Sequence, residues 1–173
     1  MANTTFDGPV RSKNGFINIG PGMTKSLSAD TVLTVQEHAG RILLLNDADG
    51  KFTLPTINVT ADSAVAGPGS DPNNKNNIGA SFYFYIETAA TDLDIKTDGT
   101  DKFTGAVMLA VDDGAKKAFV PAAANDVMTF DGGTAGGLAG SVVQVTAVDA
   151  NNYLVHNSLV IATGTIVTPF ANA

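Results

Sequence analysis

The sequence predicts an all-β fold, an antiparallel β-sandwich or barrel that carries an extended N-terminal arm. Three observations support this prediction. Residues 82–87 (FYFYIE) place two phenylalanines and an isoleucine on one side and two tyrosines and a glutamate on the other, as a strand with one buried face does. Turn signals such as Asp-Gly, Gly-Gly and Pro recur about every 8 to 12 residues. No segment has a convincing period of 3.6 residues.

Residues 1–30 are predicted to form the arm, and residues 31–173 the β-sandwich domain. The arm is rich in turn residues, with Asn-Gly at 14–15 and Gly-Pro-Gly at 20–22 around a short apolar strand. Such a segment cannot build a core of its own, so it is either a frayed terminus or docks onto its own domain or a neighbour. We expect six of its residues to contact a capsid or a neighbouring subunit: Phe6, Val10, Arg11, Phe16, Ile17 and Ile19.

From residue 31 onward the chain reads as strands separated by turns. The run at 41–45 (RILLL) is typical of a strand buried on both faces, and the Asp-Gly pair at 49–50 predicts a hairpin with 51–55 as the return strand. Residues 58–79 are predicted to form a long loop, and 58–66 is the one window that could hold a short helical turn. Further strands are expected at 82–87, 93–96, 103–111, 115–120, 126–130, 141–148, 153–156 and 159–162. The predicted core includes Leu43, Phe82, Phe84, Ile86, Leu93, Ile95 and Phe130.

Composition limits the class of partner. The chain has 173 residues, of which 44% are hydrophobic and only 16% charged. Such low charge is common in proteins that bury much of their surface in an assembly, and also occurs in ordinary secreted β-domains. The net charge is −7 and the basic residues form no patch, so we expect no nucleic-acid partner. No stretch resembles a signal peptide or a membrane span, so we expect no membrane partner.

Catalytic, metal and cofactor sites are not predicted. The absence of cysteine excludes disulfides and thiolate chemistry. His38 and His156 have no nucleophile or ligand set at a suitable spacing, so each is expected to be a hydrogen-bonded residue of a loop or a strand end. An EF-hand is excluded because Leu45 and Thr56 would stand at ligand positions. The Gly-rich stretch at 131–140 lacks the Lys-Ser/Thr of a phosphate loop and is predicted to be a close-packed turn. We therefore expect a protein that is not an enzyme.

Several short stretches carry a further signal. They are TFDGPVRSKNGF (5–16), GRILLL (40–45), FTLP (52–55), FYFYI (82–86), FTG (103–105), DVMTFDGGTAGGLAG (126–140) and ATGTIVTPF (162–170). Together they resemble small virion structural proteins of tailed bacteriophages, with the opening stretch similar to arms of marine-phage structural proteins. The resemblance covers most of the chain, and its motifs are structural turns. Where relatives often carry Trp, this chain has Tyr153, which keeps an aromatic residue in the core.

The resemblance implies a capsid decoration, or cement, protein that binds the outer surface of the phage head and stabilises it. Its partners would be the major capsid protein and further copies of itself, expected as a homotrimer at three-fold positions. Its location would be the virion, after assembly in the host cytoplasm. The lack of positive charge fits an outer surface away from packaged DNA.

Two other functions are compared with the sequence pattern. The alternative is a tail or fibre-associated adhesin module that binds a host surface glycan through the 58–79 loop or through Tyr83 and Tyr85. The same tyrosine pair could also be a packed second face or a subunit contact. A glycan-processing enzyme would need two carboxylates about 5 to 10 Å apart in a cleft, whereas the aspartates here fall in turns.

Overall fold

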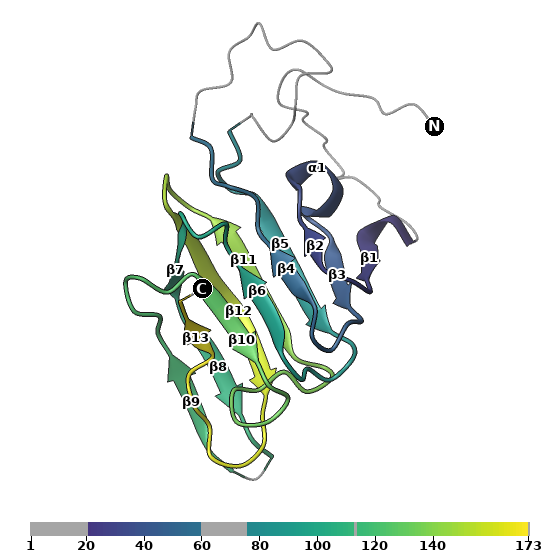
Figure 1. Cartoon of the computed structure of the whole chain (residues 1–173), viewed down its shortest axis with the longest axis vertical. Helices are drawn as coiled ribbons and strands as arrows, with labels where there is room; N and C mark the ends of the chain where they lie inside the picture. The colour runs from purple at the N-terminus through teal and green to yellow at the C-terminus, as the bar shows by residue number, and fades with distance from the viewer. Residues whose placement is uncertain (1–20, 60–75, 113, 173) are drawn as a thin grey trace, which may run out of the picture.

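Two mixed β-sheets lie face to face in the computed structural model of this chain, which describes residues 21–59, 76–112 and 114–172 (Figure 1). The larger sheet has the strand order β1-β3-β5-β11-β12-β8-β9, with β7 paired to the first half of β12. Its strands are β1 (Thr24–Leu27), β3 (Ile42–Leu45), β5 (Ser81–Ile86), β7 (Lys102–Gly105), β8 (Val107–Ala110), β9 (Lys116–Phe119), β11 (Val142–Ala147) and β12 (Asn152–Ile161).

The smaller sheet has the order β13-β10-β6-β4-β2. Its strands are β2 (Thr31–Val32), β4 (Lys51–Thr53), β6 (Leu93–Lys96), β10 (Val127–Phe130) and β13 (Phe170–Ala171). A short 3₁₀ turn, η1 (Pro21–Met23), precedes β1, and one helical turn, α1 (Val35–His38), follows β2. None of the helices in the described ranges is long and apolar enough to cross a membrane.

The pairing of the strands corrects the expectation of an antiparallel sandwich or barrel. β3 runs parallel to both of its neighbours, β1 and β5, and β4 runs parallel to β2 and β6. The predicted hairpin at 46–50 is wrong: this turn carries the chain from β3 in the larger sheet to β4 in the smaller one. In the part of the chain that the structure describes, both sheets are open, ending at β1 and β9 and at β13 and β2.

A single core fills the space between the sheets. The seven core residues that the sequence predicts are all buried, which confirms that prediction. Phe84 of the larger sheet and Phe52 of the smaller one belong to the same cluster. Tyr153 is fully buried, as expected of a core aromatic, and its hydroxyl donates to the Pro55 carbonyl oxygen at 2.5 Å. Desolvation raises the pKa of Tyr153, so this hydroxyl stays protonated and remains a donor.

The helical turn α1 was not predicted, although its signal is present in the sequence. Thr34 has an extended conformation and its hydroxyl accepts from the Glu37 N–H at 3.3 Å. Thr34 and Glu37 have the spacing of a capping box, which starts a helix. The predicted helical window at 58–66 lies mostly outside the described residues.

The larger sheet begins before residue 31. β1 pairs with β3 over its whole length, so residues 24–27 of the predicted arm belong to the sheet. Residues 1–20 of the predicted arm lie outside the described residues, as do residues 60–75 of the predicted loop.

The Gly-rich stretch at 131–140 is a close-packed turn, as predicted. A Cβ atom on Gly136 would meet the Val160 side chain at 2.5 Å, and one on Gly137 would meet Phe130 at 2.6 Å. Both glycines also have positive φ angles, which side-chain-bearing residues rarely adopt. The turn therefore requires glycine for space and for backbone conformation.

Candidate functional site

The outward side of the larger sheet is the most distinctive surface of the molecule. Strand register places its outward side chains in rows that cross five strands. One row is Thr24, Ile42, Tyr83, Gln144 and His156; the next is Ser26, Leu44, Tyr85, Val142 and Leu159. We call the apolar members of these two rows the apolar face: Ile42, Leu44, Tyr83, Tyr85, Val142 and Leu159. Neither row contains Lys, Arg, Asp or Glu.

The apolar face is open to solvent. Five of its six side chains are between 36% and 51% exposed, with Leu159 the most exposed of them. Met108 of the neighbouring strand β8 is exposed as well and extends the same side of the sheet. Scattered exposed apolar residues are normal on protein surfaces, but a contiguous patch marks an interaction site.

A shallow hollow of about 260 Å³ lies in the apolar face. Its walls include Ile42, Tyr83, Tyr85 and Val142, so it is lined mainly by apolar and aromatic side chains. The hollow is smaller than the roughly 300–1,000 Å³ of sites that enclose a drug-sized ligand. Its size therefore fits an inserted side chain better than an enclosed small molecule.

An amide pair borders the hollow. The side-chain N–H of Asn157 donates to Gln144 Oε1 at 2.8 Å. The register of β11 with β12 shifts between Val142 and Gln144, and Asn157 has a φ of 44°, a left-handed conformation that Asn tolerates better than most residues. This bulge turns Asn157 toward the hollow, whose lining includes its side chain. Bulges often re-aim side chains beside functional surfaces.

The strand β3 is buried on one face only, unlike the strand that the sequence pattern at 41–45 predicts. The pattern predicts a strand buried on both faces, yet only Leu43 and Leu45 are fully buried. Ile42 is 43% exposed and Leu44 is partly buried, because the described residues cover only the inner side of the sheet. The strand β3 therefore contains more apolar residues than the described core buries.

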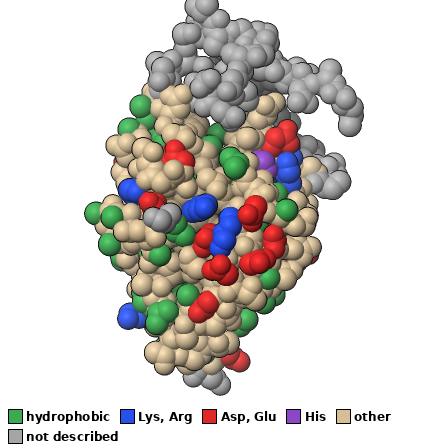
Figure 2. Space-filling view, viewed as in Figure 1, with side chains coloured by type: hydrophobic (Ala, Val, Ile, Leu, Met, Phe, Trp, Pro, Cys, Tyr) green, Lys and Arg blue, Asp and Glu red, His purple; other side chains and the backbone are tan. Residues whose placement is uncertain are grey.

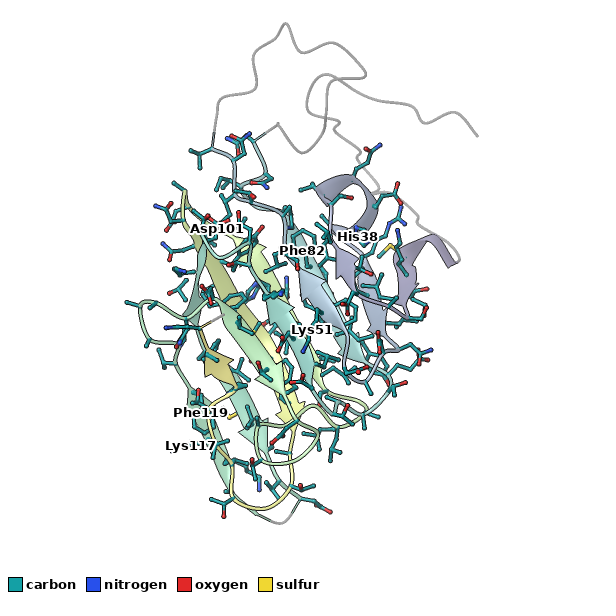
Figure 3. The ribbon with its side chains drawn as sticks, in the orientation of Figure 1. His38, Lys51, Phe82, Asp101, Lys117 and Phe119 are labelled. Atoms are coloured by element: carbon teal, nitrogen blue, oxygen red, sulfur yellow. The ribbon has the colours of Figure 1, made fainter. Side chains whose placement is uncertain are left out.

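The outward side of the smaller sheet is different, and Figure 2 shows this side with basic and acidic side chains gathered near its centre. We call Lys51, Asp94 and Thr129, which share one row of the register, the polar face. Lys51 Nζ lies 3.1 Å from Asp94 and 2.9 Å from Asp92, and the Thr129 hydroxyl donates to Asp94 at 2.6 Å. Figure 3 shows Lys51 at the centre of this side. The polar groups here bind one another.

Both histidines are hydrogen-bonded, as predicted. His38 is buried at the end of α1, not in a loop (Figure 3), and its Nδ1 accepts from the Thr34 N–H at 3.0 Å. Burial, aided by the charges of Lys25 and Arg41 and opposed by Glu37 and a backbone hydrogen bond, lowers the pKa of His38. His156 lies in the interior of β12 and not in a loop or at a strand end, which corrects the predicted location, and its Nε2 is 2.8 Å from the Thr146 hydroxyl.

Two aspartates in the turns serve the backbone. The Asp101 carboxylate is buried and accepts from the Ile57 N–H at 2.8 Å; desolvation raises its pKa. Partial burial alone would raise the pKa of Asp131, but hydrogen bonds from Gly133, Ala135 and Thr134 outweigh it and lower the pKa. Within the described ranges, no three His, Asp or Glu side chains are grouped as metal ligands would be.

The structure describes only some of the residues that the sequence predicts to make contacts. Phe6, Val10, Arg11, Phe16, Ile17 and Ile19 lie outside the described residues. Tyr83 and Tyr85 are placed together on the apolar face. Leu159 and Val142 were not singled out from the sequence, and no local signal separates them from core residues. Comparison with protein-family models, with curated proteins and with solved structures finds no significant match.

Proposed function

We propose that this protein is a structural component of a bacteriophage particle, a head decoration protein that binds the outer capsid surface and stabilises the shell. The observation that supports this proposal is the apolar face. A broad, uncharged sheet surface fits contact with another protein. The phage assignment depends on the sequence resemblance described above.

The described ionisable groups support a structural role for this chain. Asp131 accepts hydrogen bonds that close the Gly-rich turn, Asp126 pairs with Lys102 at 2.7 Å, and Asp101 holds the backbone at Ile57. Each of these carboxylates stabilises a local conformation. We propose that the protein adds contact area between capsid subunits and carries out no reaction.

We also propose that residues 1–22 contribute to particle attachment. Their sequence supplies the apolar side chains of Phe6, Phe16, Ile17 and Ile19, and burial of each would contribute roughly 1.5–3 kcal/mol. The net charge of −7 suits a position outside the shell, where packaged DNA does not have to be approached.

A heat-release experiment tests the proposal. Particles with and without the protein are heated, and the temperature at which DNA becomes accessible to a dye is recorded. We expect particles carrying the protein to release DNA at a higher temperature, in the presence and absence of a chelator. Protein lacking residues 1–22 is expected to fold but to bind particles more weakly. Equal release temperatures with and without the protein would contradict the proposal.

The second candidate function, a glycan-binding adhesin module, has one observation in its favour. Tyr83 and Tyr85 border the hollow, and the Gln144–Asn157 amide pair could supply polar contacts at its rim. Binding of soluble oligosaccharides to the isolated protein, lost in Tyr85→Ser, would favour this function.

A further inference from the structure

We propose that the apolar face is the contact between two copies of this chain, which meet through a two-fold axis with their larger sheets stacked. The inference deepens the proposed function, on which it rests, because a shell protein that acts as several copies needs a contact between them. A two-fold contact joins the copies in pairs, so it replaces the homotrimer that the resemblance implies. The inference assigns this contact to Leu159 and to the hollow bordered by Tyr83, Tyr85 and Val142.

Charge favours a second copy as the occupant. The molecule carries a net charge of −7, so two copies repel each other over most directions of approach. The two outward rows of the larger sheet contain no carboxylate and no Lys or Arg. Two copies can meet there without placing like charges opposite one another. A partner that recognised this chain through opposite charge would find nothing in these rows to bind.

The shape of the face fits its own copy. Leu159 lies on β12 and is the most exposed residue of the apolar face at 51%. The hollow lies over β5 and β11, and Val142 in its wall is the register partner of Leu159. A two-fold axis along the boundary of β11 and β12 would carry Leu159 of each copy over the hollow of the other. Such reciprocal contact is what an isologous interface requires.

The size of the face sets the strength that we expect. The apolar face covers the four neighbouring strands β3, β5, β11 and β12, which gives a width of about 19 Å at about 4.8 Å per strand. Its two rows of side chains make the face about 14 Å long, so its flat area is about 270 Å². A standard interface covers about 800 Å² of accessible surface on each partner. The contact is therefore well below standard size, and we expect a dissociation constant in the upper micromolar range.

Strand addition at the β9 edge is a less favourable way for copies to meet. The edge strand β9 carries Lys116 and Lys117, and Lys117 Nζ lies 4.9 Å from the centroid of the Phe119 ring (Figure 3). Lysines on an edge strand oppose pairing with another strand. The stacked arrangement also explains the strand at 41–45, whose apolar pattern predicts burial on both sides.

Sedimentation velocity of the full chain tests the inference over about 1 to 300 µM, which spans micromolar affinity. We expect a monomer–dimer equilibrium. Leu159→Lys should raise the dissociation constant by about 30-fold or more, as loss of an interface hot spot does. Val32→Lys is the matched control: Val32 is 72% exposed on the smaller sheet, the charge change is identical, and the dissociation constant should stay within about twofold.

Tyr85→Ser provides a second variant, on the wall of the hollow, and should also weaken the dimer. Far-UV circular dichroism and the melting temperature of each variant at low concentration show whether it is folded. A wild-type protein that stays monomeric throughout would overturn the inference, as would a dimer that Leu159→Lys leaves unchanged. A trimer would overturn the two-fold contact. A monomer that binds oligosaccharides through Tyr85 would assign the face to a glycan.

The heat-release experiment separates this inference from the proposed function. If copies associate through the apolar face but particles gain no heat resistance, the decoration function fails and the self-contact stands. If particles gain the same resistance from wild type and from Leu159→Lys while the wild type is monomeric, the self-contact fails and the decoration function stands.

Discussion

The outward sides of the two sheets differ in what their side chains interact with. On the polar face, Lys51, Asp94 and Thr129 bind one another and the exposed surface needs no partner. On the apolar face, Tyr85, Val142 and Leu159 are exposed to solvent, and their row contains no Lys, Arg, Asp or Glu. A single chain thus carries one face suited to water and one suited to another protein. In the assembly that we propose, the apolar face would form the contact.

The largest expected effect separates the two sides of a single strand, β5. Phe84 points into the core and Tyr85 points outward. Phe84→Ala should lower the free energy of unfolding by about 3 to 5 kcal/mol, and Tyr85→Ala by less than about 1 kcal/mol at submicromolar concentration. Urea unfolding of both variants measures the difference. Equal losses would mean that the apolar face is already covered within the monomer.

A smaller effect should depend on protein concentration. A dimer that dissociates on unfolding gains stability by mass action, about 2.7 kcal/mol at 100 times the dissociation constant. The melting temperature of the wild type should therefore rise with concentration, and that of Leu159→Lys should not. Differential scanning calorimetry at several concentrations checks this. A melting temperature that is independent of concentration in the wild type would contradict the self-contact.

On the polar face we expect a loss of about 1 kcal/mol from Asp94→Ala, since Asp94 accepts from Thr129 and pairs with Lys51. Asp92, whose side chain is 67% exposed, is the matched control, and Asp92→Ala should cost less than about 0.5 kcal/mol. The loss of stability from Asp94→Ala should be smaller in 1 M salt, because the Debye length then falls to about 3 Å. A larger loss from Asp92→Ala would reverse the roles that the distances assign.

The ion pair of Lys51 and Asp94 predicts that stability falls at high pH. Burial lowers the pKa of Lys51, but hydrogen bonds to Asp92 and Asp94 outweigh this and leave the pKa raised. The group therefore stabilises the fold below the ordinary lysine pKa, and this contribution is lost as the pH rises through the folded value. Lys51→Met should flatten the decline in stability above about pH 10. An unchanged decline would assign it to other groups.

The smallest expected effect concerns acid and His38. Its pKa is lowered in the fold, mainly by burial, so the unfolded chain binds a proton more readily and stability falls as the pH drops below about 6.5. Lys25, Glu37 and Arg41 are the charged groups that act on it. His38→Gln should reduce the slope of stability against pH between about 6.5 and 5. The same slope in both proteins would remove His38 from the account.

Periodicity sufficed for the inner side of the fold. The alternation at 82–87 correctly places Phe82, Phe84 and Ile86 in the core, because the side chains of a strand point to opposite faces whatever its partners are. Periodicity does not show which strands pair with one another. The Asp-Gly turn after β3 connects two sheets, and a turn dipeptide does not encode which sheet the next strand joins.

Only some residues of the apolar face could be predicted from the sequence. The tyrosines at 83 and 85 and the apolar run at 41–45 signal surface beyond the core, but Val142 and Leu159 look like ordinary strand residues. They reach the same face only through the register of β11 with β5 and β12. The Gln144–Asn157 pair depends on a bulge and a left-handed residue, which no local pattern specifies.

Thiol accessibility provides the most direct test that the apolar face is a contact surface. The chain contains no cysteine, so Leu159→Cys and Val32→Cys each carry a single thiol, one on each outward side of the molecule. Their rates of alkylation are compared at low and high protein concentration. We expect the thiol at 159 to react at least about fivefold more slowly at concentrations well above a micromolar dissociation constant, while the thiol at 32 keeps its rate. Equal rates for the thiol at 159 at both concentrations would contradict the account.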